Sequence, residues 1–229
     1  MSGRYAIYFI PSADSPTYQR VSAWLGYSIL QEQTLSQREL PADLHEFRGF
    51  TRHAALYGCH ATLKPPFRLR AGLKEKHLLK IFKHFCRICR PIRCSGLRVD
   101  SIGRFLALTQ SKNSKKLDEL ATDCVQTFDL FRDEISEAEF NKRQPEKLSP
   151  NQLKMLQQWG YPFVLDEFRF HITLSDPLPE SSLSACKKAL NNFLLPTFSD
   201  SFVIDSLSLC HQAHAGEPFR VLKTCTLKR

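Results

Sequence analysis

The sequence contains one short pattern twice: His60-Ala61-Thr62-Leu63 and His171-Ile172-Thr173-Leu174, with the second histidine 111 residues after the first. Side chains alternate between the two faces of an extended strand, so the histidine and the threonine of each copy share one face. The other two residues of each copy are apolar and fit a hydrophobic core. Each copy therefore predicts a strand with one apolar face and one face that carries an imidazole and a hydroxyl.

A cation stands next to each copy at the spacing that keeps it on the face of the histidine. Lys64 follows the first copy, and Arg169 precedes the second. We expect Lys64 or Arg169 to supply positive charge to a bound anion. Arg169 has an alternative role as a structural ion-pair partner of Asp166 or Glu167.

The segments after the two copies are also similar. Each histidine strand is followed by a helical stretch, a strand-like run and a second strand. These segments are 74–90, 92–102 and 105–108 after His60, and 181–195, 202–209 and 219–222 after His171. The distance from the histidine to the phenylalanine that begins the last strand is 45 residues in one copy and 48 in the other. This similarity predicts an internal duplication of a β-α-β-β unit.

The duplication predicts an α+β fold with two pseudo-symmetric lobes, whose antiparallel sheets flank a central cleft. Residues 1–111 would form the N-terminal lobe, residues 112–160 would insert helices, and residues 161–229 would form the C-terminal lobe, all within one compact bilobed domain. A two-fold relation would bring the two histidine strands together, with equivalent groups on opposite sides of one phosphate.

The elements outside the repeats are predicted from capping and breaking residues. A first strand is expected over residues 5–10, and a helix over 16–33 because Ser15-Pro16 is suited to cap and begin it. Residues 34–56 predict a loop with a short helix. Pro65-Pro66 should end the first histidine strand, because proline has no N–H to donate to a ladder.

The composition is that of a folded globular protein. The chain has 229 residues, of which 42% are hydrophobic and 11% aromatic. The first ten residues hold too short an apolar run for a signal peptide, and no stretch approaches the roughly 20 apolar residues of a membrane span. We therefore expect a cytoplasmic protein with no membrane partner, and the sequence indicates no obligate protein partner.

The eight cysteines are scattered through apolar contexts in a chain without an export signal. We expect reduced, buried thiols, because disulfides belong to oxidising compartments. Cys86, Cys89 and Cys94 could suggest zinc, but no second ligand pair follows at the spacing of a zinc finger. We therefore predict no metal site and no cofactor.

Positive charge is concentrated in the first repeat. Between His60 and Val99 there are 11 Lys or Arg residues and one acid, Glu75, whereas the whole chain carries +9. On the predicted helix the cations recur at helical spacing opposite the apolar face; they are Lys76, Lys80, Lys83, Arg87 and Arg90. This stripe is either a solvated helix face or a surface for RNA, and no aromatic series accompanies it to stack on bases.

Longer strings around the motifs resemble a known family. They are Tyr57-Gly58-Cys59-His60-Ala61-Thr62-Leu63-Lys64-Pro65-Pro66-Phe67, Trp159-Gly160-Tyr161-Pro162 and Phe168-Arg169-Phe170-His171, and the similarity extends from Arg4-Tyr5-Ala6-Ile7-Tyr8-Phe9 to the last strand. With the duplicated motif they resemble the two-histidine phosphoesterase superfamily, in a bacterial branch commonly encoded beside phosphonate-utilisation genes. Cys59 stands where that branch has phenylalanine, a departure that bears on packing because Cys59 lies on the face opposite His60.

The paired motifs suit the cleavage of a phosphodiester. One histidine can remove a proton from the nucleophile while the other donates a proton to the leaving oxygen. Thr62 and Thr173 can donate hydrogen bonds to the non-bridging oxygens. The predicted catalytic residues are thus His60, His171, Thr62 and Thr173, and the predicted phosphate-binding residues are Lys64 and Arg169.

We predict a metal-independent phosphodiesterase that acts on a cyclic phosphate of ribose or on an RNA end. The resemblance further implies a ribosyl phosphate from phosphonate metabolism as the substrate. The alternative is a binding protein that captures an RNA end or a phosphorylated metabolite without turnover. Two histidines and two threonines favour the enzyme, because a binder needs cations more than a paired acid and base.

Overall fold

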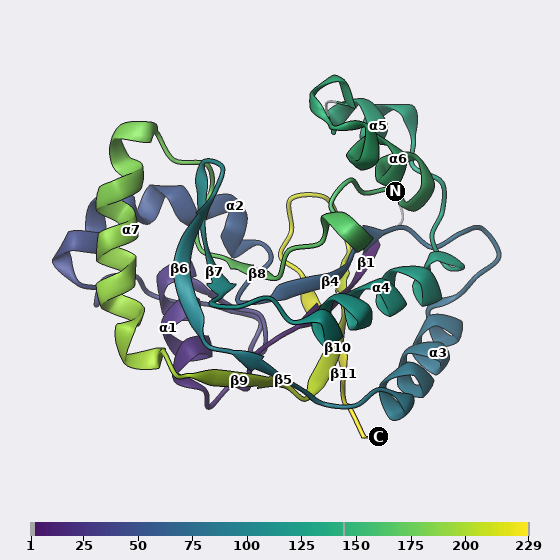
Figure 1. The fold of residues 1–229 in the computed structure, drawn as a ribbon, viewed down its shortest axis with the longest axis horizontal. Coiled ribbons are helices and arrows are strands. Elements are labelled where there is room, and N and C mark those ends of the chain that lie inside the picture. The colour runs from purple at the N-terminus through teal and green to yellow at the C-terminus, as the bar shows by residue number, and fades with distance from the viewer. Residues whose placement is uncertain (1–2, 144, 229) are drawn as a thin grey trace.

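A seven-stranded antiparallel sheet forms the centre of the molecule (Figure 1). The computed structural model describes residues 3–143 and 145–228. From one edge to the other, the strands are β11 (Arg220–Thr226), β10 (Ser206–Gln212), β1 (Arg4–Phe9), β4 (Ala61–Phe67), β8 (His171–Thr173), β7 (Phe105–Gln110) and β6 (Leu97–Ile102). The two histidine strands, β4 and β8, are neighbours in the middle. The predicted α+β class with antiparallel sheets is confirmed.

Helices and short strands surround this sheet. The α-helices are α1 (Pro16–Leu25), α2 (Arg52–Ala55), α3 (Glu75–Ile88), α4 (Lys115–Asp129), α5 (Glu137–Lys142), α6 (Pro150–Trp159) and α7 (Glu180–Leu194). The 3-10 helices are η1 (Ala42–Thr51), η2 (Pro145–Lys147), η3 (Leu165–Glu167) and η4 (Leu195–Thr197). Two small sheets pair β2 (Tyr27–Ser28) with β3 (Gln33–Thr34) and β5 (Ile92–Ser95) with β9 (Ser201–Ile204). Across the described residues, every helix is too short or too polar to span a bilayer.

The two repeats have the same order of elements: β4-α3-β5-β6-β7 and β8-α7-β9-β10-β11. In each repeat the run that follows the helix is divided into two strands, one in a small sheet and one in the central sheet. The first run divides at Gly96, whose N–H donates to Asp200 O at 2.8 Å. A Cβ atom at Gly96 would lie 2.0 Å from Ser199 O, so only glycine fits this crossing.

The repeats interlock in space. Strands β7 and β6 of the first repeat extend the sheet outward from β8, whereas β10 and β11 of the second repeat extend it outward from β1, the neighbour of β4. Each helix packs on strands of the other repeat. Helix α3 of the first repeat packs on β10 and β11, and helix α7 of the second repeat packs on β6 and β7. The predicted boundaries at residues 111 and 161 therefore separate the repeats in sequence, but each half of the sheet contains strands from both.

Two predicted elements have different ends. Helix α1 stops at Leu25 rather than near residue 33, because Gly26 adopts φ 75° as its C-cap and residues 27–34 form the β2–β3 hairpin. Strand β4 does not end at Pro65-Pro66. It runs on to Phe67, which pairs with Tyr5 of β1, with register shifts between the two strands.

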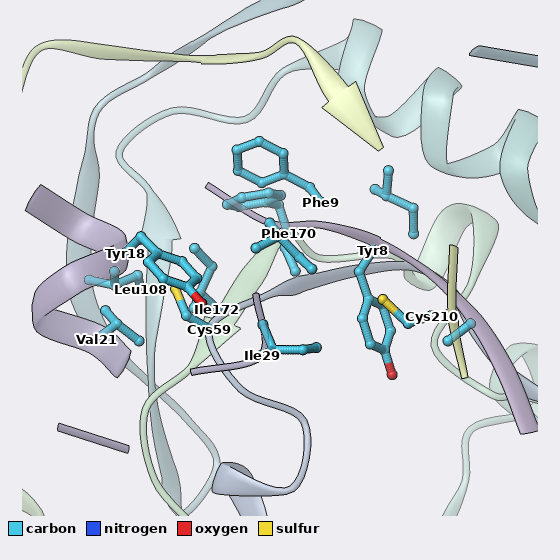
Figure 2. Packing of buried hydrophobic residues seen from close by; sticks show 14 of the residues in the cluster. Tyr8, Phe9, Tyr18, Val21, Ile29, Cys59, Leu108, Phe170, Ile172 and Cys210 are labelled. Atoms are coloured by element: carbon cyan, nitrogen blue, oxygen red, sulfur yellow. The ribbon is translucent and has the colours of Figure 1, made fainter. Parts of the chain in front are cut away.

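The core confirms the predicted apolar faces of the histidine strands. Ala61, Leu63, Ile172 and Leu174 are all at most 1% exposed. Cys59 is also fully buried and lies among the hydrophobic side chains of Figure 2, where burial raises the pKa of its thiol. All eight cysteines are free thiols.

Candidate active site

The pairing of β4 with β8 assembles the two motifs on one surface. Ala61 is opposite Ile172 in antiparallel register, so continuing the register by one residue in each direction places each histidine opposite the threonine of the other strand. Directly opposite Cβ atoms are about 4.5–5.5 Å apart and diagonal ones about 7–8 Å. The residues brought together on this face are His60, Thr62, His171 and Thr173.

The backbone and Thr62 hold the ring of His60 from both sides. Its Nδ1 lies 3.0 Å from Gly58 O, and its Nε2 lies 3.1 Å from Thr62 Oγ1. Because a carbonyl oxygen only accepts, Nδ1 carries the proton, and Nε2 accepts from the threonine hydroxyl. Burial lowers the pKa of His60 from 6.5 to about 4, so the ring is neutral at pH 7. A neutral Nε2 on the face shared by the two motifs is suited to accept a proton.

His171 repeats this arrangement in a more open setting. Its Nδ1 donates to Arg169 O at 2.8 Å, again to the carbonyl two residues earlier in the chain. Burial lowers the pKa of His171 as well. The residue is half-buried, whereas His60 is 6% exposed. The ring of Phe105 lies 5.8 Å from the His171 ring.

Two hydroxyls flank the motifs on the neighbouring strands. Tyr8 of β1 pairs with Thr62, and Thr109 of β7 pairs with His171, so the four residues form one row across the sheet. The Tyr8 and Thr109 hydroxyls are buried and make no hydrogen bond within the part of the chain that the structure describes. Figure 2 shows Tyr8 beside Cys210, with its hydroxyl directed away from the other labelled side chains.

Aromatic rings enclose His60. The Tyr8 ring centroid lies 4.0 Å from that of His60, and the Tyr57 ring is stacked at 5.9 Å. Phe219 contacts both tyrosine rings, at 5.6 and 5.2 Å. Tyr8, Tyr57 and Phe219 are not among the site residues predicted from the sequence. The alternation of β1 makes Tyr8 a candidate for one face, but the pairing of β1 with β4 is needed to bring it to His60.

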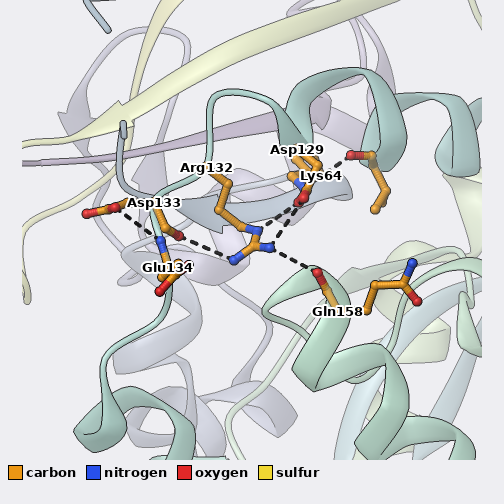
Figure 3. Close-up of polar contacts among 7 residues, drawn as sticks. Lys64, Asp129, Arg132, Asp133, Glu134 and Gln158 are labelled. Carbon is orange, nitrogen blue, oxygen red and sulfur yellow. Dashed lines mark hydrogen bonds and ion pairs between the residues drawn. The ribbon is translucent and has the colours of Figure 1, made fainter. Parts of the chain in front are cut away.

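The structure corrects the prediction that Lys64 shares the face of His60. The register shifts between Thr62 and Lys64, and Lys64 is opposite Ile7 rather than in the row of Tyr8. Its side chain is 1% exposed, and Nζ donates to Asp129 Oδ1 at 2.9 Å and Val125 O at 3.2 Å (Figure 3). The ammonium therefore joins β4 to α4, away from the paired histidines.

Arg169 is exposed and two residues before His171. Within the described residues it makes no ion pair with Asp166 or Glu167, the alternative considered from the sequence. Glu167 instead accepts hydrogen bonds from Asn151 Nδ2 at 2.9 Å and Gln152 Nε2 at 3.0 Å. The guanidinium of Arg169 thus has no ion-pair partner within the described residues.

The basic stripe on α3 lies on the surface. Lys76, Lys80, Lys83 and Arg87 of α3 are exposed, and so is Arg90, which was predicted on the helix but lies beyond its end at Ile88. The apolar face of the helix is buried, with Leu78, Phe82 and Phe85. In residues 3–143 and 145–228, no three His, Cys, Asp or Glu side chains gather in a way that could hold a metal ion.

The chain is similar to several known proteins. Residues 62–220 match a family described as "Protein of unknown function (DUF1045)". A protein from Janthinobacterium sp. (strain Marseille), named ribose 1,5-bisphosphate phosphokinase PhnN, is 36% identical over 221 residues, which cover 94% of this chain and 49% of that protein. One of the same name from Laribacter hongkongensis (strain HLHK9) is 28% identical, over 96% of this chain and 51% of that protein. The chain spans about half the length of these curated relatives.

Solved structures also match this chain, at low sequence identity. A crystal structure of E. coli LigT complexed with 3'-AMP matches with a TM-score of 0.50 and 14% identity, over 100% of both chains. The structure of TT0787 of Thermus thermophilus matches with a TM-score of 0.49 and 14% identity, over 98% of both chains. The match to LigT shows a common fold.

Proposed function

Because the chain belongs to the DUF1045 family and has the fold of the two-histidine phosphoesterases, we propose that it is a phosphodiesterase that opens a cyclic phosphate of ribose by paired-histidine catalysis, without a metal ion. The observation that carries this proposal is the register of β4 and β8, which puts two histidines and two threonines on one face. A surface that only captured anions would not need two neutral imidazoles with matched carbonyl partners.

The reaction follows from the two Nε2 atoms. One histidine takes a proton from a water molecule while the water oxygen forms a bond to phosphorus. The other histidine gives a proton to a ribose oxygen as the bond between that oxygen and phosphorus breaks. When the phosphate binds, the Thr62 hydroxyl turns from His60 Nε2 to a non-bridging oxygen, which frees Nε2, and Thr173 donates to another non-bridging oxygen; negative charge increases on these oxygens in the transition state. The product is a ribose phosphate monoester.

Both histidines are neutral at pH 7 before substrate binds, because burial lowers both pKa values. The negative charge of a bound phosphate favours the protonated form of the histidine that acts as the acid. Arg169 is the exposed cation near this site and is our candidate for binding the phosphate. Lys64 is left out, because Asp129 already neutralises it.

The similar proteins support ribose as the substrate scaffold. The names of the curated relatives specify a kinase of ribose 1,5-bisphosphate, and LigT was crystallised with 3'-AMP, a phosphate monoester of a nucleoside. Opening a cyclic phosphate across C1 and C2 of ribose gives a phosphate monoester at one of those carbons. We therefore propose that this chain supplies such an ester in phosphonate metabolism.

Purified protein should be assayed against ribose 1,2-cyclic phosphate, nucleoside 2',3'-cyclic phosphates and short RNAs with cyclic ends, with 31P NMR to identify each product. We expect turnover of a cyclic ribose phosphate that EDTA does not reduce. His60→Ala and His171→Ala should abolish turnover and keep the fold, and His84→Ala, an exposed histidine on α3, is the matched control. Activity that needs a divalent ion would contradict the proposal. Binding of ribose phosphates without any turnover would favour the binding protein instead.

A further inference from the structure

The segment that follows the second motif carries an acidic residue, Asp176, that the proposed reaction does not use. Its carboxylate accepts two backbone hydrogen bonds from α2, Oδ2 from His53 N and Oδ1 from Ala54 N, both at 2.9 Å. The backbone N–H of Asp176 donates to Phe50 O at 2.6 Å. These three bonds fasten the beginning of α2 to the chain just beyond β8.

The carboxylate of Asp176 caps α2 from a distant part of the chain. The first N–H groups of a helix have no carbonyl partner within it, and Thr51, the N-cap residue of α2, makes no side-chain hydrogen bond to them. Asp176 supplies the acceptors instead, and its negative charge is favourable near a helix N-terminus. Within the described residues no lysine or arginine pairs with Asp176, so α2 provides the donors that its carboxylate needs.

The segment that carries Asp176 is itself fixed on β7. The N–H groups of Leu174 and Ser175 donate to Leu106 O at 2.8 and 3.2 Å. The buried Ser175 hydroxyl accepts from Leu106 N at 2.9 Å, and Trp24 Nε1 donates to Leu174 O at 2.6 Å. The carboxylate of Asp176 therefore has a defined position relative to β8, the strand of the second motif.

The other end of α2 leads directly to His60. Tyr57 N donates to Ala54 O at 3.1 Å, so the turn after α2 is bonded back onto the helix. Gly58 N donates to Ala55 O at 3.1 Å in the same way. The Tyr57 ring stacks on the His60 ring with 5.9 Å between centroids, and Gly58 O accepts the Nδ1 proton of His60. Helix α2 thus sets the position of two groups that orient this imidazole.

His60 depends on the preceding segment more than His171 does on α2. His60 lies before the first residue of β4, whereas His171 is the first residue of β8. Across the described part of the chain, the ladder between these strands contains the single pair of Ala61 and Ile172. Because this ladder is short, the direction of the His60 ring is left to the segment that joins α2 to β4.

We propose that Asp176 is a positioning residue: through α2 it holds the His60 ring in the Nδ1–H tautomer, with Nε2 on the face shared by the two motifs. This role deepens the proposed function and rests on it for its catalytic meaning. A small displacement of a proton-transfer group lowers the rate strongly, because the reacting atoms must be aligned. Asp176 acts only through α2, since both of its carboxylate oxygens are bonded to backbone N–H groups.

Two substitutions at Asp176 test this role. Asp176→Asn keeps the size of the side chain but turns an NH2 group toward a backbone N–H, and Asp176→Ala removes both acceptors. With ribose 1,2-cyclic phosphate, kcat should fall about 10-fold in the first variant and about 100-fold in the second. The matched controls are Ser149→Ala, which removes the side-chain cap of α6, and Glu180→Gln, which removes a carboxylate from the first turn of α7. The controls should lower the urea midpoint and keep the wild-type kcat.

The tautomers of the two histidines separate positioning from a general loss of stability. Imidazole 1H–15N correlation spectra distinguish the Nδ1–H form from the Nε2–H form, and the signals are assigned by their loss in His60→Ala and His171→Ala. Wild type should show the Nδ1–H form for both rings, because each Nδ1 donates to a carbonyl. In both Asp176 variants His60 should become a mixture of the two tautomers, while His171 keeps the Nδ1–H form.

An unchanged His60 tautomer in the Asp176 variants, or the same change in the two controls, would overturn the assignment. If Asp176→Ala does not fold, Asp176→Asn decides the test. The spectra need no substrate, so the inference and the proposed reaction can fail separately. If no cyclic phosphate is hydrolysed but the His60 tautomer depends on Asp176, the positioning role stands and the reaction fails. If cyclic phosphates are hydrolysed and both variants keep the wild-type kcat and tautomers, the reaction stands and the positioning role fails.

Discussion

Replacing Gly58 by alanine tests how the backbone positions His60. Gly58 has φ +67°, and its carbonyl accepts the Nδ1 proton of His60. An alanine in this left-handed conformation destabilises the folded protein by about 1–2 kcal/mol. Its Cβ would also lie 2.7 Å from the Cβ of Ile29, a buried residue that must shift, and overpacking of this kind costs about 1–3 kcal/mol. Alanine also lowers the conformational entropy of the unfolded chain relative to glycine, which offsets about 0.4–1 kcal/mol of this loss.

The expected loss of stability is therefore about 1–5 kcal/mol, measured by urea unfolding with fluorescence of the buried Trp24. The folded protein should also lose about 10- to 100-fold in kcat, because a displaced carbonyl no longer fixes the tautomer and direction of His60. Gly72→Ala is the matched control: φ is +83°, but nothing lies within 4 Å of the new Cβ. It should lose only the backbone part of the stability and keep its full kcat. If Gly58→Ala behaved like Gly72→Ala in both measurements, the positioning role would be wrong.

Three further predictions concern charge and protonation. Stability should fall as pH decreases from about 6.5 toward 4, because burial lowers the pKa of His60 from 6.5 to about 4 and the unfolded chain binds more protons between these two values. The urea midpoint of the His60→Asn variant should depend less on pH across this range than the wild-type midpoint does. The pH profile of kcat should be bell-shaped and unaffected by chelator, with limbs that belong to the histidine pair; loss on chelation and recovery with a divalent ion would contradict it. Glutamate in place of three exposed lysines of α3 should leave turnover of small cyclic phosphates unchanged, whereas weaker RNA binding with a flatter salt dependence would favour RNA as the ligand; these lysines are Lys76, Lys80 and Lys83.

The parts of the fold that follow from local periodicity were predictable. The alternation in the two histidine strands gave their apolar faces, and the repeated order of elements gave the duplication. Capping residues located a helix start equally well, as at Ser15, whose side chain accepts a hydrogen bond from Tyr18 N at the beginning of α1. These features depend on neighbours in the chain, and the sequence displays them directly.

Apart from the end of α1, which the local C-cap Gly26 decides, the errors arose where pairing between distant segments decides the outcome. Lys64 was placed by perfect alternation, but the irregular register of β4 against β1 turns it toward Asp129. Pro65-Pro66 was expected to end β4. However, β4 pairs with β8 at Ala61, before the prolines, so residues 65 and 66 need no N–H to bond to β8 and the strand can continue through them. The same limit hid Tyr8 and Tyr57, because only the folded sheet brings their rings to His60.

The duplication explains why the motifs meet, and the surroundings explain how two equal histidines can take different roles. Around the Ala61–Ile172 pair, each face residue of one strand has an equivalent on the other. The scissile phosphate has no such symmetry, because one of its oxygens arrives with the nucleophile and another leaves with ribose. The protein breaks the symmetry outside the motifs. His60 is enclosed by aromatic rings, while His171 is half-buried, with Arg169 exposed beside it. In the proposed reaction, the two similar motifs supply both proton-transfer groups, and the different neighbours give the two histidines different surroundings for the acid and base steps.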